Sequence, residues 1–341
     1  MIVSGVIAAE VPAQLPKPDG KPADQSKPVK VFIMMGQSNM LGFGRVGPAS
    51  TKGSLEYMVK EKGKYQHLVD DKGKWTVRTD VRHVFVMPKG NNMAVMRNEW
   101  LAPTGNFGPE LGFGHVMGHI HDEPVLLLKA CIGNRSLGWD LLPPGSKQFE
   151  LDGKIYAGYK ESPASWDKDT QPKGILWYAG KQYDDDVANA KAVLKELAKY
   201  YPGYKDQGYE IAGFVWWQGH KDQNAAHASR YEQNLVQLIK SLRKDFDSPN
   251  AKFVLATGCG NPGRDGFGLK IAEAQLAVGD AKKYPEFEGN VKAVDTRDLW
   301  REAANSPSNQ GYHYNHNAET YYETGDRLGR AMAELLQAGK K

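Results

Sequence analysis

The feature of this sequence that most constrains its fold is a series of short apolar runs that alternate with segments of helical periodicity. The first run, Val29–Gln37 (VKVFIMMGQ), is continuous, as is typical of a strand buried on both faces. Similar runs occur at Pro124–Ala130, Ile211–Trp217, Lys252–Thr257 and, more weakly, Val291–Asp295. Helical patterns lie among and after them at Asp184–Tyr200, Ala226–Phe246, Leu269–Val278 and Ala318–Gln337. The alternation predicts an α/β fold, a three-layer α/β/α sandwich around a mostly parallel central sheet.

Two long segments, residues 45–106 and 143–174, interrupt this alternation and are rich in Gly, Pro, Lys and aromatic residues. Loops of this length are uncommon unless they are functional, so we predict insertions that wall a site. No internal repeat or interdomain linker is evident, which favours a single domain over residues 30–341. Residues 1–29 are predicted to be a flexible leader or the remnant of a secretory signal. Such leaders are common in exported proteins, so we expect a secreted or periplasmic location.

Composition excludes several classes of protein. The formal net charge is only +4, from 44 basic and 40 acidic side chains, too weak to indicate a nucleic-acid partner. No apolar run approaches the roughly 20 residues that span a bilayer, so we expect a soluble protein without a membrane span. The two cysteines, Cys131 and Cys259, lack metal-ligand spacing and are predicted to be buried free thiols. The nine histidines contain no H-E-x-x-H pattern, and we expect no metal or other cofactor.

The strongest chemical signal is Gly36–Met40 (GQSNM), directly after the first predicted strand. A serine on such a turn projects from the carboxyl edge of the sheet. There the free N–H groups at the start of the next helix, including that of Ser38, can stabilise an oxyanion. The alternative is a Gly-Ser turn that only caps a helix. The G-x-S-x-G elbow fits poorly, because position 40 is Met and nearly the whole domain follows.

GQSNM resembles block one of the SGNH (GDSL-like) hydrolases, and more narrowly the sialate O-acetylesterase and carbohydrate esterase family six branch, in which Gln replaces the aspartate of GDS. Further segments resemble that family in the same order along Val31–Leu336, namely Phe107–Gly112, Lys129–Leu137, Trp216–Asp222 and Gly311–Asn315. The resemblance implies an SGNH-hydrolase, flavodoxin-like fold. It also implies a serine esterase that hydrolyses O-acetyl or other short acyl esters on carbohydrates through an acyl-enzyme intermediate.

The resemblance also implies roles for individual residues. Ser38 would be the nucleophile and His313 the base. The backbone oxyanion donor maps to Gly133 or Asn134, because Asn134 replaces the second glycine of the family motif. The side-chain amide of Gln218 would be a further donor, although it could instead be a buried amide that closes a backbone bond. The residues themselves agree, since Ser38, Gly133 and Gln218 each follow a predicted strand end, where open α/β sheets place ligands.

The base lacks its expected partner. SGNH enzymes usually carry D-x-x-H, whereas the residue three before His313 is Gln310, and the residue three before His316 is His313 itself. An orienting acid fixes the tautomer of the imidazole and stabilises its charged form. We therefore predict a Ser-His dyad in which Gln310 or a backbone carbonyl holds the imidazole. The alternative is a carboxylate from elsewhere, namely Asp222, Asp295 or Asp298.

Candidate substrate contacts flank these positions. They are Gln37, Asn39, Arg135, Trp139, Trp217, His220 and His316, and His220 stands where the family has Glu. The insertions rich in Gly, Trp and Tyr suit a sugar better than a lipid chain, so an acetylated carbohydrate is the expected partner. Two alternatives stay open. One is an SGNH esterase or lipase for non-carbohydrate acyl esters. The other is a catalytically impaired carbohydrate-binding pseudo-enzyme, which the missing acid near His313 favours.

Overall fold

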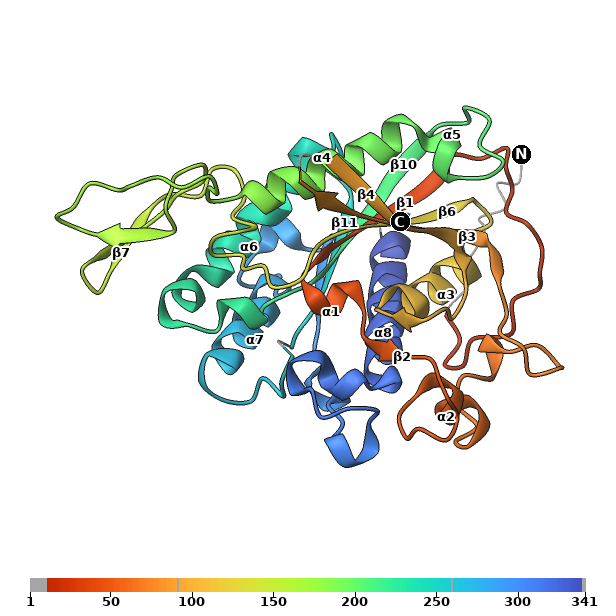
Figure 1. Ribbon diagram of the computed structural model, residues 1–341. Coiled ribbons are helices and arrows are strands. Elements are labelled where there is room, and N and C mark those ends of the chain that lie inside the picture. Colours follow the sequence, from red (N-terminus) through yellow and green to blue (C-terminus); the bar gives the residue numbers. More distant parts are fainter. Residues whose placement is uncertain (1–10, 91, 259, 339–341) are drawn as a thin grey trace.

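The computed structural model describes residues 11–90, 92–258 and 260–338. Among them, seven strands form a central sheet in the order β12-β11-β10-β1-β6-β3-β4 (Figure 1). All neighbouring pairs are parallel except β3 and β4, which are antiparallel at one edge. The strands are β1 Val29–Gly36, β3 Arg78–Lys89, β4 Asn92–Leu101, β6 Val125–Ala130, β10 Tyr209–Trp217, β11 Lys252–Ala256 and β12 Val291–Val294. The predicted mostly parallel sheet is confirmed.

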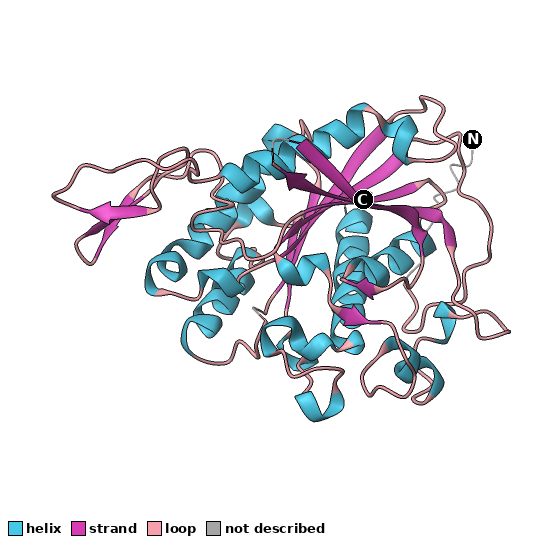
Figure 2. Cartoon of the chain, viewed as in Figure 1, coloured by secondary structure: helices cyan, strands magenta, loops and turns pink. Residues whose placement is uncertain are grey.

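Helices cover both faces of this sheet, so the sandwich has three layers (Figure 2). Alternate side chains of β1 point to opposite faces. Val31 and Ile33 pack in one core with α4 Lys181–Lys195, α6 Ala225–Asp245 and α7 Gly266–Val278. Phe32 and Met34 pack in the other core with α3 Glu110–Ile120 and α8 Ala318–Ala338. The continuous apolar run of β1 follows from this burial on both sides.

Residues 45–106 are not the loop insertion that the sequence predicts, because they contribute β3 and β4 to the sheet. The signal of β3 is masked by Arg82 and His83 in its middle, both buried. The Arg82 guanidinium donates to the Asn98 side chain and to the Tyr200 carbonyl oxygen, which gives its N–H groups acceptors inside the sheet edge. The same segment also holds α2 Leu55–Lys60 and the short strand β2 Gly44–Arg45, which pairs with β5 Asn106–Phe107.

Residues 143–180 form an arm that projects from the sandwich (Figure 1). Three short antiparallel strands build it: β7 Phe149–Leu151, β8 Lys154–Tyr156 and β9 Ser165–Asp167. After the arm, α4 and the short helix α5 Leu197–Tyr200 lead back to the sheet.

The N-terminal segment differs from the predicted flexible leader over its described part. Arg330 of α8 donates to the carbonyl oxygens of Val11, Pro12 and Ala13, and Leu15 is buried in the core beside α3 and α8. The predicted signal remnant, residues 1–10, lies outside the described residues, as does Cys259. Cys131 is a buried free thiol, as predicted. No helix within the described chain has both the length and the apolar character needed to cross a bilayer.

Candidate active site

The candidate nucleophile lies where β1 meets the short helix α1 Ser38–Leu41. Gly36 is required just before it, because a β-carbon there would lie 2.2 Å from the carbonyl oxygen of Trp217 at the end of β10. This close approach brings the carboxyl ends of β1 and β10 together. In the run Gly36–Met40, Ser38 is partly exposed while the other four residues are buried. The fold therefore presents the serine alone at the carboxyl edge of the sheet.

The two neighbours of Ser38 make internal contacts rather than the predicted substrate contacts. Gln37 Oε1 accepts hydrogen bonds from the backbone N–H groups of Gly219 and Lys221, each at 3.3 Å. Asn39 Nδ2 donates to the carbonyl oxygen of Tyr312 at 3.3 Å, and its Oδ1 accepts from the Tyr321 hydroxyl at 2.7 Å. Both side chains are buried. They tie α1 to the loop after β10 and to the segment that carries His313.

The loop after β6 runs alongside Ser38. A β-carbon on Gly133 would lie 3.5 Å from that of Ser38, and Asn134 adopts a left-handed backbone conformation with φ of 59°. Within the described chain, the backbone N–H groups of Ser38, Gly133 and Asn134 donate no hydrogen bond. Backbone N–H groups without an acceptor, close to a serine, are the kind of donor that can stabilise an oxyanion.

The side chain of Gln218 has no free N–H group. Its Nε2 atom lies 2.6 Å from Asp222 Oδ2, 2.9 Å from the Arg135 carbonyl oxygen and 3.2 Å from Gln37 Oε1. Its Oε1 atom accepts from the Tyr231 hydroxyl at 2.9 Å. A primary amide has only two N–H donors, and here three buried acceptors compete for them. The geometry matches the alternative interpretation, a buried amide that closes a backbone bond, rather than the predicted oxyanion donor.

Asp222 organises the loop after β6. Its carboxylate, fully buried in the short 3₁₀ helix η2 His220–Asp222, accepts from the backbone N–H groups of Leu137 at 2.9 Å and Gly138 at 2.7 Å. Together with the bond from Gln218, these contacts fix the backbone that follows Gly133. Asp222 thus holds the loop after β6, and no hydrogen bond or ion pair joins it to His313 among the described residues.

A buried ion pair that the sequence analysis did not identify supports the end of α1. Lys129 Nζ lies 2.5 Å from Glu110 Oε2 and donates to the Leu41 carbonyl oxygen at 3.1 Å. Both side chains are almost fully buried. Burial raises the pKa of Glu110, but the Lys129 ammonium and other nearby donors outweigh it and hold that pKa below its ordinary value. The sequence signal that could have identified this ion pair is Lys129 itself, the single charge within the apolar run VLLLKA.

His313 lies in the 3₁₀ segment η6 Gly311–His316, directly before α8. Its Nδ1 atom donates to Gln310 Oε1 at 2.9 Å, because an amide oxygen only accepts. The Nε2 atom is therefore the basic nitrogen, and it forms no hydrogen bond within the described chain. The ring stacks on Phe43, with centroids 3.7 Å apart and planes 10° apart. Burial, together with the imidazoles of His316 and His220, lowers the pKa of His313 to about 4.

His316 is a less suitable base. Its Nε2 atom lies 2.7 Å from the same Gln310 oxygen, and its Nδ1 atom is buried without a partner. Neither ring nitrogen is open to a serine hydroxyl. No hydrogen bond joins Ser38 to His313 or to His316 among the described residues, and in ligand-free sites such bonds are often long.

The other predicted orienting acids lie elsewhere. Asp295 accepts from Thr257 and Arg297, and Asp298 pairs with Arg327 at 2.7 Å. Neither contacts His313, as is also true of Asp222. The Gln310 contact is the arrangement expected of a dyad.

Four predicted substrate residues remain, and three of them make contacts within the protein. Trp217 is buried in the core, and Trp139 packs at the base of the arm. Arg135 donates to Gln182 at 3.1 Å and lies 5.0 Å from the Trp177 ring. His220 is partly exposed, 6.1 Å from the Tyr312 ring, and burial lowers its pKa. Of these four residues, His220 is the best placed to meet a substrate.

A narrow crevice, too small to hold a water molecule, adjoins the residues on either side of Ser38. Both sequence neighbours of Ser38 line it, together with Trp217, Gln218, Gly219, His220 and Gly258. Across the described residues, no group of three or more His, Cys, Asp and Glu side chains is arranged to hold a metal ion.

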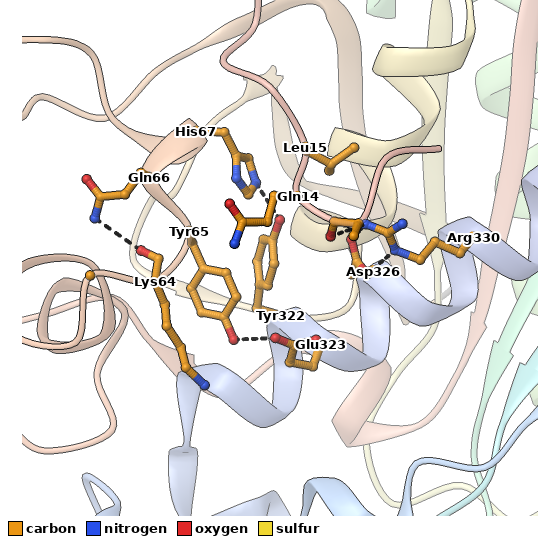
Figure 3. Close-up of a pocket in the computed structure, with 12 residues that line it drawn as sticks. Gln14, Leu15, Lys64, Tyr65, Gln66, His67, Tyr322, Glu323, Asp326 and Arg330 are labelled. Atoms are coloured by element: carbon orange, nitrogen blue, oxygen red, sulfur yellow. Dashed lines mark hydrogen bonds and ion pairs between the residues drawn. The ribbon is translucent and has the colours of Figure 1, made fainter. Parts of the chain in front are cut away.

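A larger cavity, of about 320 Å³, lies along α8 away from these residues (Figure 3). Its polar side chains largely bind one another. The Tyr65 hydroxyl donates to Glu323, His67 Nε2 lies 2.6 Å from the Tyr322 hydroxyl, and Arg330 pairs with Asp326. None of the predicted site residues lines this cavity.

The mostly parallel sheet between two layers of helices is the predicted three-layer α/β fold. The chain belongs to the family described as carbohydrate esterase, sialic acid-specific acetylesterase, whose model matches residues 28–334. This confirms the predicted family.

Two solved structures share the fold. A protein from Arabidopsis thaliana is 16% identical with a TM-score of 0.50, over 89% of this chain and 98% of that one. A structure described as a novel carbohydrate acetylesterase from Xanthomonas citri is 14% identical with a TM-score of 0.50. That match covers 88% of this chain and 55% of the other, so the chain spans little more than half of it. No curated protein sequence matches the chain.

Proposed function

We propose that this protein is a serine esterase that removes O-acetyl groups from carbohydrates, with Ser38 as nucleophile and His313 as base. The observation that carries the proposal is the arrangement around Ser38. A partly exposed serine lies beside open backbone N–H groups, and a loop tied to α1 holds a histidine with a free Nε2 atom. Family membership supports the substrate class.

In the proposed first step, the Ser38 oxygen attacks the acetyl carbonyl carbon while His313 Nε2 takes the hydroxyl proton. The N–H groups of Ser38, Gly133 and Asn134 stabilise the oxyanion. Collapse of this intermediate breaks the ester bond. His313 returns its proton to the departing sugar oxygen and leaves acetyl-Ser38. Water then attacks that ester, with His313 again taking and returning a proton, and acetate leaves.

Gln310 and Phe43 take the place of the orienting acid. The amide oxygen keeps the proton on Nδ1 of His313, and the stacked phenyl ring fixes the plane of the imidazole. An amide does not stabilise the imidazolium by charge, so the base is weak and stays neutral in mild acid. Gln218 acts indirectly, by holding the Arg135 carbonyl and the Asp222 carboxylate behind the loop after β6.

Membership of an acetylesterase family supports preference for acetyl over longer acyl groups. We also propose an exported location, supported by the Pro- and Lys-rich composition of the N-terminal segment. One second candidate has a specific observation behind it. Among the described residues no carboxylate contacts His313, and three acceptors compete for the two N–H groups of Gln218, as a carbohydrate-binding protein without turnover would allow.

Steady-state hydrolysis of an ester panel tests the proposal. The panel contains acetylated xylo-oligosaccharides, O-acetylated sialic acid, acylglycerols, and p-nitrophenyl acetate with its octanoyl counterpart. We expect turnover of the acetylated sugars and preference for p-nitrophenyl acetate over the octanoyl ester. Preference for octanoyl esters would exclude acetyl specificity. Absence of turnover on the whole panel would favour the binding protein.

A further inference from the structure

A second pocket lies between α6 and the base of the projecting arm. It encloses about 220 Å³ and is lined by residues 138–149 on one side and by residues 230–237 of α6 on the other. Gly138 belongs both to this pocket and to the loop that Asp222 holds after Gly133. The five residue steps from Gly133 to Gly138 span at most about 18 Å of extended chain, so the pocket lies within that distance of Gly133.

The lining is polar, and much of it is unpaired. The amides of Gln148 and Asn234 form no hydrogen bond within the described chain, and the Ser146 hydroxyl is buried without a partner. Gln233 uses its oxygen to accept from Arg230 at 3.0 Å, which leaves its NH₂ group open. Carboxamides with both donor and acceptor atoms free match the hydroxyl groups of a sugar.

Arg230 is fixed in place for binding. Its guanidinium carbon lies 4.7 Å from the ring centroid of Phe149, whose other neighbour is the stacked ring of Tyr156 at 5.0 Å. The contact with the Phe149 ring and one hydrogen bond to Gln233 hold the guanidinium and leave most of its N–H groups available. The lining contains Lys147 as a second cation and no carboxylate. The pocket therefore suits neutral or acidic sugars, not cationic ones.

We propose that this pocket binds a sugar unit of the substrate glycan some distance along the chain from the acetylated unit at Ser38. The inference rests on the proposed function for its purpose, but binding itself does not depend on catalysis. The α6 helix begins beside the catalytic loops and rises about 1.5 Å per residue, so Arg230 and Asn234 lie within its first three turns. A short oligosaccharide can span the distance between Ser38 and this pocket. Binding of its distal sugar in the pocket would raise kcat/KM only for substrates long enough to reach both.

The test separates binding from catalysis. Xylotetraose, as a neutral probe, and tetragalacturonate, as an acidic probe, are titrated by NMR into Ser38→Ala protein and into the same protein with Gln233→Ala and Asn234→Ala added. We expect at least one probe to bind, and the added pair to weaken it about 5- to 30-fold, as for two lost hydrogen bonds. Sensitivity to salt would identify the acidic probe as the better match.

Kinetics supply the second arm. In the otherwise wild-type enzyme, Gln233→Ala with Asn234→Ala should lower kcat/KM for an acetylated tetrasaccharide by a similar factor and leave p-nitrophenyl acetate unchanged. Lys244→Ala, on an exposed position of the same helix outside the pocket, is the control and should change neither. Failure of both probes to bind, or equal binding in the parent and in the variant, would overturn the inference. If the wild-type protein does not hydrolyse p-nitrophenyl acetate at all, the result counts against the proposed function and not against sugar binding by the pocket.

Discussion

Replacing Gln310 by Glu tests how the base is held. The Gln310 amide oxygen lies 2.9 Å from His313 Nδ1 and 2.7 Å from His316 Nε2. Glutamate has the same shape, and its second oxygen can accept from the Tyr312 hydroxyl, which the Gln310 NH₂ group now contacts. The change therefore adds a negative charge beside the imidazole with little steric disturbance. It converts the predicted dyad into a triad.

The size of the effect follows from the distance. An opposite charge within about 4–6 Å shifts a pKa by about 1 to 3, so the pKa of His313 should rise from about 4 to about 5–7. His313 must be neutral to accept the serine proton, and protonation removes the base as pH falls through its pKa. The acid limb of kcat/KM should therefore lie near pH 4 in the wild type and move to higher pH in Gln310→Glu. Because the imidazolium is stabilised, kcat above pH 7 should rise on the order of tenfold or more.

The assay is the pH dependence of kcat/KM for p-nitrophenyl acetate, with the melting temperature of each variant as a check on folding. Gln310→Leu is the matched control, since it removes the acceptor without adding charge and should lower kcat at every pH. Superimposable acid limbs for the wild type and Gln310→Glu would refute the reasoning. Either His313 would not be the base, or Gln310 would not hold it.

Three further outcomes follow from the structure. Phe43→Leu should lower kcat about tenfold or more with little change in KM, because the plane of the His313 imidazole is no longer fixed. Lys129→Met should cost about 3–5 kcal/mol of unfolding free energy in urea, because it leaves a buried carboxylate uncompensated. Burial lowers the pKa of His67 to about 4 and that of His83 to about 3 in the folded protein. In the unfolded chain both histidines have a pKa of about 6.5, so as pH falls below that value the unfolded chain binds more protons than the folded protein. Stability should decline between pH 6.5 and 4, as melting temperatures would record.

Each of these three predictions has a result that would contradict it. Phe43→Tyr retains the stacked ring and should restore kcat; equal losses in both variants would exclude stacking as the cause. Lys17→Met removes a solvent-exposed ion pair and should cost less than about 1 kcal/mol, so equal costs for Lys17 and Lys129 would contradict the buried role. A melting temperature that stays constant from pH 6.5 to 4 would show that the buried histidines do not control acid stability.

The strands that the sequence predicts best are those with both faces buried. β1, β6 and β10 are mostly apolar, with one charged residue each, because helices cover both sides of them. The sequence does not indicate β3, because the buried Arg82 in its middle is stabilised by hydrogen bonds to Asn98 and Tyr200 that exist only in the folded chain. Composition predicts a flexible leader, whereas the three carbonyl oxygens that bind Arg330 leave no compositional trace.

The candidate site residues also divide into those with a local sequence signal and those whose role depends on contacts made only in the folded chain. The strand-turn-helix setting of Ser38 and the D-x-x-H spacing that points to Gln310 are local, so the sequence shows them. Whether Gln218 has a free N–H group depends on Asp222 and the Arg135 carbonyl oxygen, which only the folded loops bring together. Phe43 carried no signal, because its role arises from stacking on a ring 270 residues later.

Turnover of purified Ser38→Ala tests the central claim most directly. With p-nitrophenyl acetate at pH 7, the account predicts a loss in kcat on the order of 10⁶, as for the nucleophile of a serine protease, with an unchanged melting temperature. Ser229→Ala, an exposed serine on α6, should retain full activity. Turnover by folded Ser38→Ala within about tenfold of the wild type would contradict Ser38 as the nucleophile and the mechanism built on it.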